Sequence, residues 1–172
     1  RARTRYETER FADRITIYKV PVDNQNIHHA TNRELLRYSW RGLGLARRLA
    51  SQHSYGVSFA FAGVPAGAIS YLLNLTHGLP YIVSLQGPDV PGFEARYNYL
   101  YPVLTPFIKR IWRRAGAVTA ISAEQAALAH RTMPGLELIT IPNGVDTTSF
   151  APAGDGPKHA FTIVCVARLI ER

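Results

Sequence analysis

The chain has 172 residues, of which 47% are hydrophobic and 19% are charged, and its formal net charge is +8. This composition excludes a disordered chain and allows one sizeable buried core. The basic balance favours an anionic partner, which could be nucleic acid, an anionic membrane surface or a negatively charged substrate. A single cysteine, Cys165, excludes a disulfide framework and is typical of a reducing compartment.

The first third of the chain predicts one strand and one helix. Residues 1–14 form a charged run that we expect to be an exposed tail, and residues 14–22 are rich in strand-forming residues. The segment from Thr31 to Glu34 has the spacing of a helix capping box. Behind it, apolar residues recur at helical spacing and predict the packed face of this helix: Leu36, Trp40, Leu43, Ala46 and Ala50.

Strands and helices then alternate. Further strands are predicted at residues 57–61, 81–85, 117–121 and 137–141. One helix is predicted to have Pro65 in its first turn and Gly78 at its end, one to run from Pro106 to Ala115, and one to follow a second capping box at Ser122–Gln125. Such alternation predicts an α/β fold with a parallel sheet, and the apolar strand 81–85 indicates cover on both faces.

A change of composition predicts a domain boundary near residue 150. Turn residues at 142–144 end the last strand, a small-residue linker follows at 151–157, and a new apolar run begins at Phe161. We therefore predict one domain over residues 1–150, and a linker with the first strand of a second domain over residues 151–172. We expect the chain to be part of a longer protein, since no Met begins it and the second domain barely starts.

The loop from Gln86 to Phe93 is the most informative stretch. In open parallel sheets, ligands bind beyond the carboxyl ends of the strands, where this loop begins. It contains two glycines, two prolines and Asp89. A carboxylate and a side-chain amide at this position suit hydrogen bonding to hydroxyls, as on a sugar. The alternative is a plain turn in which Asp89 bonds to backbone amides.

Several other kinds of site are not indicated. Gly63 and Gly67 are not followed by the Lys-Ser/Thr of a phosphate loop, and neither a dinucleotide-binding glycine motif nor a Gly-x-Ser-x-Gly elbow occurs. The six histidines lack metal-ligand spacing, so no metal site is predicted. The helix at 106–115 carries basic residues opposite its apolar face: Lys109, Arg110, Arg113 and Arg114. These residues are either a solvated surface or a contact with an anionic membrane.

Four segments together resemble family 4 retaining glycosyltransferases. Ile139–Asp146, with Phe150 and Pro152 after it, resembles the interdomain crossing of that family. Residues 163–169 resemble the first strand of its nucleotide-sugar domain, which ends in Gly/Ala-Arg-Leu. Ala117–Ser122 is similar to the family's strand ending in Ser, and Tyr81–Phe93 to its acceptor-side strand and Gly-x-Asp-Val-Pro-Gly loop.

The resemblance implies the GT-B fold, in which two Rossmann-like domains face each other across a cleft. The chain would hold an incomplete N-terminal half, a Rossmann-like parallel sheet with helices on both faces. It implies transfer of a sugar, with retention, from a nucleotide-sugar donor to a carbohydrate or lipid-linked acceptor. No cofactor or metal is implied. Alone, the chain is expected to be inactive, because most of the donor site would lie beyond Arg172.

The chemistry of the loops at the strand ends and the resemblance together give candidate roles. Asp89 is the catalytic candidate, and three residues are candidates for the acceptor side: Gln86, Gly87 and Ser122. Arg168 falls on the arginine that holds the donor diphosphate, where a guanidinium neutralises charge on the leaving group. Asn143 and Gly144 fall on the interdomain hinge. Many family members have a His in the loop after the acceptor strand, but here Gln86 precedes Gly87, so no catalytic His is assigned.

Two alternatives stay open. One is a nucleotide-sugar 2-epimerase of the same fold, and the other is a non-catalytic module that binds an anionic surface. Nucleic acid is not an expected partner, because no recognised binding motif accompanies the charge. The expected location is the cytoplasm, with peripheral contact at the inner face of the membrane as an option.

Overall fold

The computed structural model describes residues 5–22 and 31–151 of the chain. It divides into two compact units, Arg1–Pro142 and Asn143–Arg172. Every helix and strand among the described residues belongs to the first unit. The predicted second domain at 151–172 lies outside the described residues apart from Ala151, and it stays a prediction.

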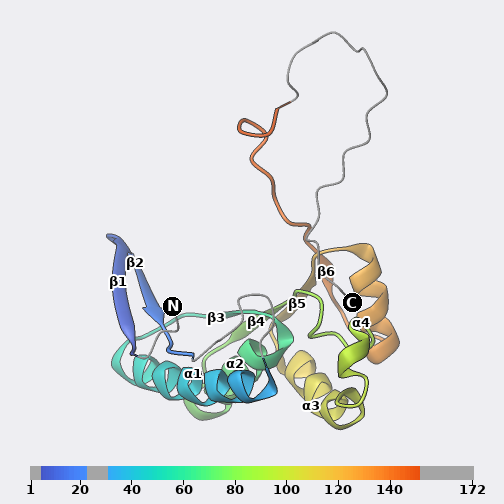
Figure 1. Ribbon diagram of the computed structural model, residues 1–172, viewed down its shortest axis with the longest axis horizontal. Helices are drawn as coiled ribbons and strands as arrows, with labels where there is room; N and C mark the ends of the chain where they lie inside the picture. Colours follow the sequence, from blue (N-terminus) through green and yellow to red (C-terminus); the bar gives the residue numbers. More distant parts are fainter. Residues whose placement is uncertain (1–4, 23–30, 152–172) are drawn as a thin grey trace. The chain divides into compact units, whose positions relative to one another are not determined.

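A four-stranded parallel sheet forms the centre of the first unit (Figure 1). Its strands are adjacent in chain order: β3 (Ser58–Phe61), β4 (Tyr81–Leu85), β5 (Ala117–Ala120) and β6 (Ile139–Thr140). The predicted α/β fold with a parallel sheet flanked by helices is therefore confirmed. The last strand is shorter than predicted, with two residues in place of five.

Three helices connect these strands: α2 (Ala68–His77), α3 (Tyr101–Arg114) and α4 (Ala123–Thr132). Each connection steps to the next strand in the same direction, and right-handed crossovers then place all three helices on one face, whereas the sequence predicted helices on both faces. The core lies there and includes Tyr81, Val83, Ile111, Trp112 and Val118. On the opposite face, the side chains of Phe59 and Phe61 are exposed, with ring centroids 4.9 Å apart.

Helix α1 (Asn32–Gln52) begins at the predicted capping box. The backbone N–H of Glu34 donates to the Thr31 hydroxyl at 3.3 Å, and the Thr31 N–H donates to the Glu34 carboxylate at 2.6 Å. The predicted packed face is wrong at Leu36 and Trp40, whose side chains are 72% and 79% exposed. The helix instead turns Gly42 toward α2, where a Cβ atom would lie only 3.2 Å from a methyl group of Ile69.

The expected exposed tail at residues 1–14 is wrong over β1 (Glu7–Ala12), which is a strand. It pairs antiparallel with β2 (Ile15–Lys19), so the strand predicted at 14–22 joins a separate hairpin and not the parallel sheet. An ion pair between Lys19 and Glu9 links the two strands. Every residue of β1 is exposed. Without a buried face there is no alternation of apolar and polar residues, so residues 7–12 carry no pattern that predicts a strand.

Two helix starts differ from the prediction. Pro65 does not begin α2, because it lies in the short π-helical segment η1 (Gly63–Gly67), after a cis Val64–Pro65 bond. Helix α3 begins at Tyr101, five residues before Pro106. Pro102 lies in its first turn, where the missing N–H needs no partner. The Thr105 hydroxyl donates to the Tyr101 carbonyl at 2.6 Å inside this helix.

The end of α2 agrees with the prediction, since Gly78 follows it in a left-handed conformation with φ of 67°. A short 3-10 helix, η2 (Ala95–Tyr97), precedes α3. Within residues 5–22 and 31–151, no helix is long and apolar enough to cross a membrane.

Tyr81 provides a test of this packing. Its buried hydroxyl donates to the Ile111 carbonyl at 2.6 Å and so links β4 to α3. Burial, and secondarily the neighbouring Tyr71, raises the pKa of Tyr81 from 10.0 to about 12. The contribution of the Tyr81 hydroxyl to the stability of the fold is fully present below pH 10. It is lost as the pH rises toward 12, because in this range the hydroxyl of Tyr81 ionises in the unfolded chain before it ionises in the folded one.

We therefore expect Tyr81→Phe to lower the free energy of unfolding at pH 7 by about 1 kcal/mol. Between pH 10 and 12, this difference from the wild type should shrink. Urea unfolding at several pH values measures both effects. Tyr55→Phe is the control, because Tyr55 is half exposed. A Tyr81→Phe difference that does not change with pH would contradict the burial of an ionisable hydroxyl here.

Candidate functional site

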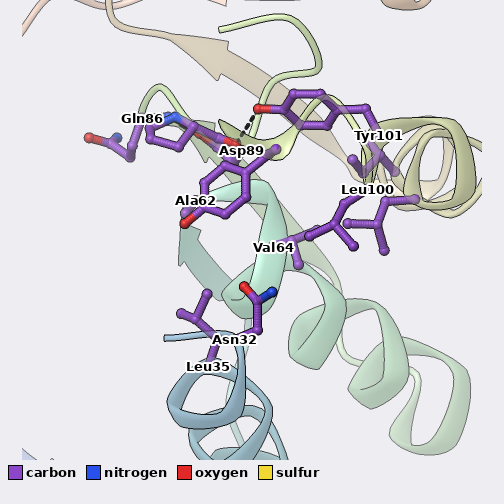
Figure 2. A pocket seen from close by; sticks show the side chains of 12 residues that line it. Asn32, Leu35, Ala62, Val64, Gln86, Asp89, Leu100 and Tyr101 are labelled. Atoms are coloured by element: carbon purple, nitrogen blue, oxygen red, sulfur yellow. Dashed lines mark hydrogen bonds between the residues drawn. The ribbon is translucent and has the colours of Figure 1, made fainter. Parts of the chain in front are cut away.

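A pocket of about 350 Å³ opens beside the carboxyl ends of β3 and β4 (Figure 2). It is the place where the topology of an open parallel sheet predicts a ligand. Its walls come from α1, from the segments that follow β3 and β4, and from the start of α3. The lining residues are Asn32, Leu35, Ala62, Val64, Gln86, Pro88, Asp89, Tyr97, Leu100, Tyr101, Leu104 and Ile108.

Asp89 holds together the two loops that follow β3 and β4. Its carboxylate is 7% exposed and accepts backbone N–H groups from both loops. The N–H of Gly63, after β3, donates to Oδ2 at 2.6 Å. In its own loop, the N–H of Gly87 donates to Oδ1 at 2.7 Å, and that of Gln86 donates at 3.0 Å. The predicted turn role of Asp89 is present in this geometry, and a direct part in catalysis stays a prediction.

Two of these amide donors belong to glycines that have little room for a side chain. A Cβ atom on Gly63 would lie 3.3 Å from the Trp112 indole nitrogen and 3.5 Å from the Asp89 carboxylate. Gly87 has φ of 138°, and a Cβ atom there would lie 3.0 Å from the Phe93 ring. A side chain at either position would therefore push the amide away from Asp89 or strain the backbone.

Ala62 lies between β3 and Gly63 and lines the pocket. Its backbone has an uncommon conformation, with φ of 89°. Its N–H donates to the Ser84 carbonyl, and its carbonyl accepts from the Gly67 N–H, both at 2.9 Å. These two bonds hold a strained residue in place, and such strain is often found at functional sites.

The polar side chains that line the pocket have defined partners. The Tyr101 hydroxyl donates to the Pro88 carbonyl at 3.0 Å, and the Asn32 amide donates to the Tyr99 hydroxyl at 3.0 Å. The Gln86 amide nitrogen donates to the Ser84 hydroxyl at 2.9 Å. No partner for the Gln86 amide oxygen occurs among the described residues, so this oxygen can accept a hydrogen bond from a ligand. Burial raises the pKa of Tyr101, so its hydroxyl is protonated at neutral pH.

The structure brings Gln86, Gly87 and Asp89 together, but Ser122 lies elsewhere. Ser122 is the N-cap of α4, where its hydroxyl accepts the Gln125 N–H at 3.2 Å. It lines a second pocket of about 340 Å³ with Gly92 and Phe93. The predicted second capping box is only half formed, because the Gln125 side chain accepts from the N–H of Ile121 and not of Ser122.

The remaining candidates lie outside the first unit. Arg168 is outside the described residues, so its role stays a prediction. Asn143 and Gly144 are exposed and begin the second unit, and their hinge role also stays a prediction. Asp146 follows them and accepts hydrogen bonds from the backbone and hydroxyls of Thr148 and Ser149. These bonds, led by the Ser149 hydroxyl, lower the pKa of Asp146 well below its usual range.

The apolar wall of the pocket was not predicted from the sequence. Leu100 lies just before α3, and Leu104 lies in its first turn, ahead of the predicted start at Pro106, and Ile108 follows one turn later. Two features of the sequence point to this wall: the aromatic run at 97–101, and Pro102, which suits a first helical turn. Within the described part of the chain, no group of three His, Cys, Asp or Glu could hold a metal ion.

Asp89→Asn tests the carboxylate. The substitution would place an NH₂ donor opposite an amide N–H of Gly63 or Gly87, so one buried amide loses its acceptor. We expect a loss of about 2–3 kcal/mol in the free energy of unfolding, as for hydrogen bonds to charged groups. Chemical denaturation measures it, with Glu94→Gln as a control that removes a charge from the same loop. Equal stability of Asp89→Asn and the wild type would show that the carboxylate does not lock the loops.

Comparison with known proteins identifies the family. The sequence matches the glycosyl transferase 4-like domain over residues 1–144, which include the whole sheet and the pocket. No individual curated protein matches the chain significantly. The match supports glycosyl transfer in general, and with it a sugar donor and an acceptor as substrates. The chain belongs to the family of glycosyl transferase 4-like domains.

Proposed function

We propose that the chain forms the acceptor side of a retaining glycosyltransferase that uses a nucleotide-sugar donor, as the sequence resemblance implies. The observation that carries this proposal is the pocket beside the carboxyl ends of β3 and β4, bounded by a loop that Asp89 locks in place. A nucleotide-sugar 2-epimerase of the same fold rearranges its substrate without a sugar acceptor, so transfer to an acceptor separates the two functions.

In this proposal, Gln86 and Asp89 have different tasks. The Gln86 amide oxygen lacks a partner among the described residues and accepts a hydrogen bond from the acceptor hydroxyl, which orients that hydroxyl for attack. Asp89 is a positioning residue, since backbone amides occupy both of its oxygens. The donor diphosphate gains negative charge as the sugar leaves, and Arg168 neutralises it with a charge-assisted hydrogen bond. No metal or other cofactor is included in this proposal.

We also propose peripheral contact with an anionic membrane surface at the cytoplasmic side. On α3, Arg110, Arg113 and Arg114 are exposed and Lys109 is half-buried. The apolar face of the same helix is in the core, where Ile108, Ile111 and Trp112 are at most 2% exposed. This helix has no apolar face left to insert into lipid, so the contact would be electrostatic and would weaken in salt.

The division between the acceptor side and the donor side can be measured in the full protein that contains this chain. Gln86→Ala should raise the acceptor KM or lower turnover and leave donor affinity unchanged. Arg168→Ala should weaken donor binding by about 1.5–3 kcal/mol, the loss of one charge-assisted bond. Calorimetry with a panel of nucleotide sugars measures affinity, and nucleotide release with an acceptor mixture measures turnover. A wild-type protein that releases nucleotide from none of these donors would overturn the proposed function.

The membrane contact has its own test. Replacing Lys109, Arg110 and Arg113 by Gln should weaken binding to vesicles that contain anionic lipid, by about 1 kcal/mol for each basic side chain near the surface. Arg131→Gln, on α4, is a control because Arg131 is exposed and distant in sequence from these residues. Vesicle co-sedimentation at two salt concentrations measures the effect. If the wild type does not bind these vesicles, the residues are a solvated surface.

A further inference from the structure

The walls of the pocket are predominantly hydrocarbon. Apolar side chains and tyrosine rings supply most of them: Leu35, Val64, Pro88, Leu100, Leu104, Ile108, Tyr97 and Tyr101. Figure 2 shows Gln86 at one end of the pocket, and Leu100 and Tyr101 toward the other. The volume of about 350 Å³ lies within the range typical of ligand pockets. The transfer of an apolar group from water into this pocket is favourable, because it removes apolar surface from water.

The same pocket is poorly suited to bury a sugar ring. A sugar carries several hydroxyls, and each one that leaves water needs a hydrogen-bond partner. Most polar groups on the walls are engaged within the protein: the Asp89 carboxylate with amides, the Tyr101 hydroxyl with Pro88, and the Asn32 amide nitrogen with Tyr99. The amide oxygens of Gln86 and Asn32 are without a hydrogen-bond partner among the described residues. A ligand that is polar at one end and apolar along its length fits this distribution.

We propose that this pocket binds the hydrocarbon chain of a lipid-linked acceptor. The chain lies against Leu104 and Ile108, and the hydroxyl-bearing part of the acceptor lies at Gln86, beyond the carboxyl ends of the strands. This inference rests on the proposed function, because it names the class of acceptor that the pocket would take. It selects a lipid-linked acceptor over a free carbohydrate.

The test compares two probes that share a sugar and differ in hydrocarbon, n-octyl β-D-glucoside and methyl β-D-glucoside, each below its micelle concentration. We expect the wild type to bind the octyl probe at least about tenfold more tightly, because each methylene group that moves from water into the pocket contributes favourably to binding. Leu104→Gln should remove this preference, and so should Leu100→Gln. Val103→Gln is the matched control on the same helix, because Val103 is 78% exposed and does not line the pocket.

A second measurement does not depend on the folding of a variant. In the wild type with labelled methyl groups, the octyl probe should shift the NMR signals of Leu104 and Ile108 and leave Leu75 of α2 unchanged. Equal binding of the two probes, or shifts that avoid the pocket, would overturn the inference. Binding is measured without a nucleotide sugar, so this result is independent of turnover. A protein that transfers sugar but shows no octyl preference would keep the proposed function and lose only the lipid-linked acceptor.

Discussion

The carboxylate of Asp89 is the interaction on which the site depends. It lies buried between the segments that follow two neighbouring parallel strands, and it accepts backbone N–H groups from both. A buried carboxylate is stable only when such partners replace water. The two loops are thereby fixed to one another, and the wall of the pocket takes its shape from them.

Further contacts extend from this centre. The Tyr101 hydroxyl donates to Pro88, next to Asp89, and so fixes the start of α3 against the loop. The Asn32 amide donates to Tyr99 and connects α1 to the segment before α3. Elements that are far apart in the sequence therefore form one pocket. Substitution of Asp89 is expected to affect the whole pocket and not one contact, because both loops depend on it.

The sequence predicts those parts of the fold in which burial imposes a pattern. Residues 81–85 are apolar nearly throughout because β4 is a central strand, and their predicted limits match the structure. Thr31 and Glu34 bond to backbone N–H groups at the start of their own helix, so a short stretch of sequence was enough to predict where α1 begins. The exposed strand β1 has no buried face and gave no pattern. The packed side of α1 depends on the approach of α2 to Gly42, which composition does not reveal.

The candidate site was predicted only in part, because some of its features are local in the sequence and others depend on the folded chain. The loop after β4 was identified from its own residues, including Asp89 and Gln86. The contact of Asp89 with Gly63 spans 26 positions, and it depends on two strands being adjacent in a sheet. The apolar wall from α3 likewise exists only in the folded chain. Local chemistry therefore predicted the polar end of the pocket, whereas its hydrocarbon lining needed the tertiary structure.

Amide hydrogen exchange at Gly63 and Gly87 tests the central claim most directly, that one carboxylate locks both loops. In the wild type, we expect both amides to exchange as slowly as those of β4, because each donates to a buried acceptor. In Asp89→Ala, both should exchange much faster while the amides of α4 change little. Fast exchange at Gly63 and Gly87 in the wild type would contradict the claim, since the loops would then open without breaking the core.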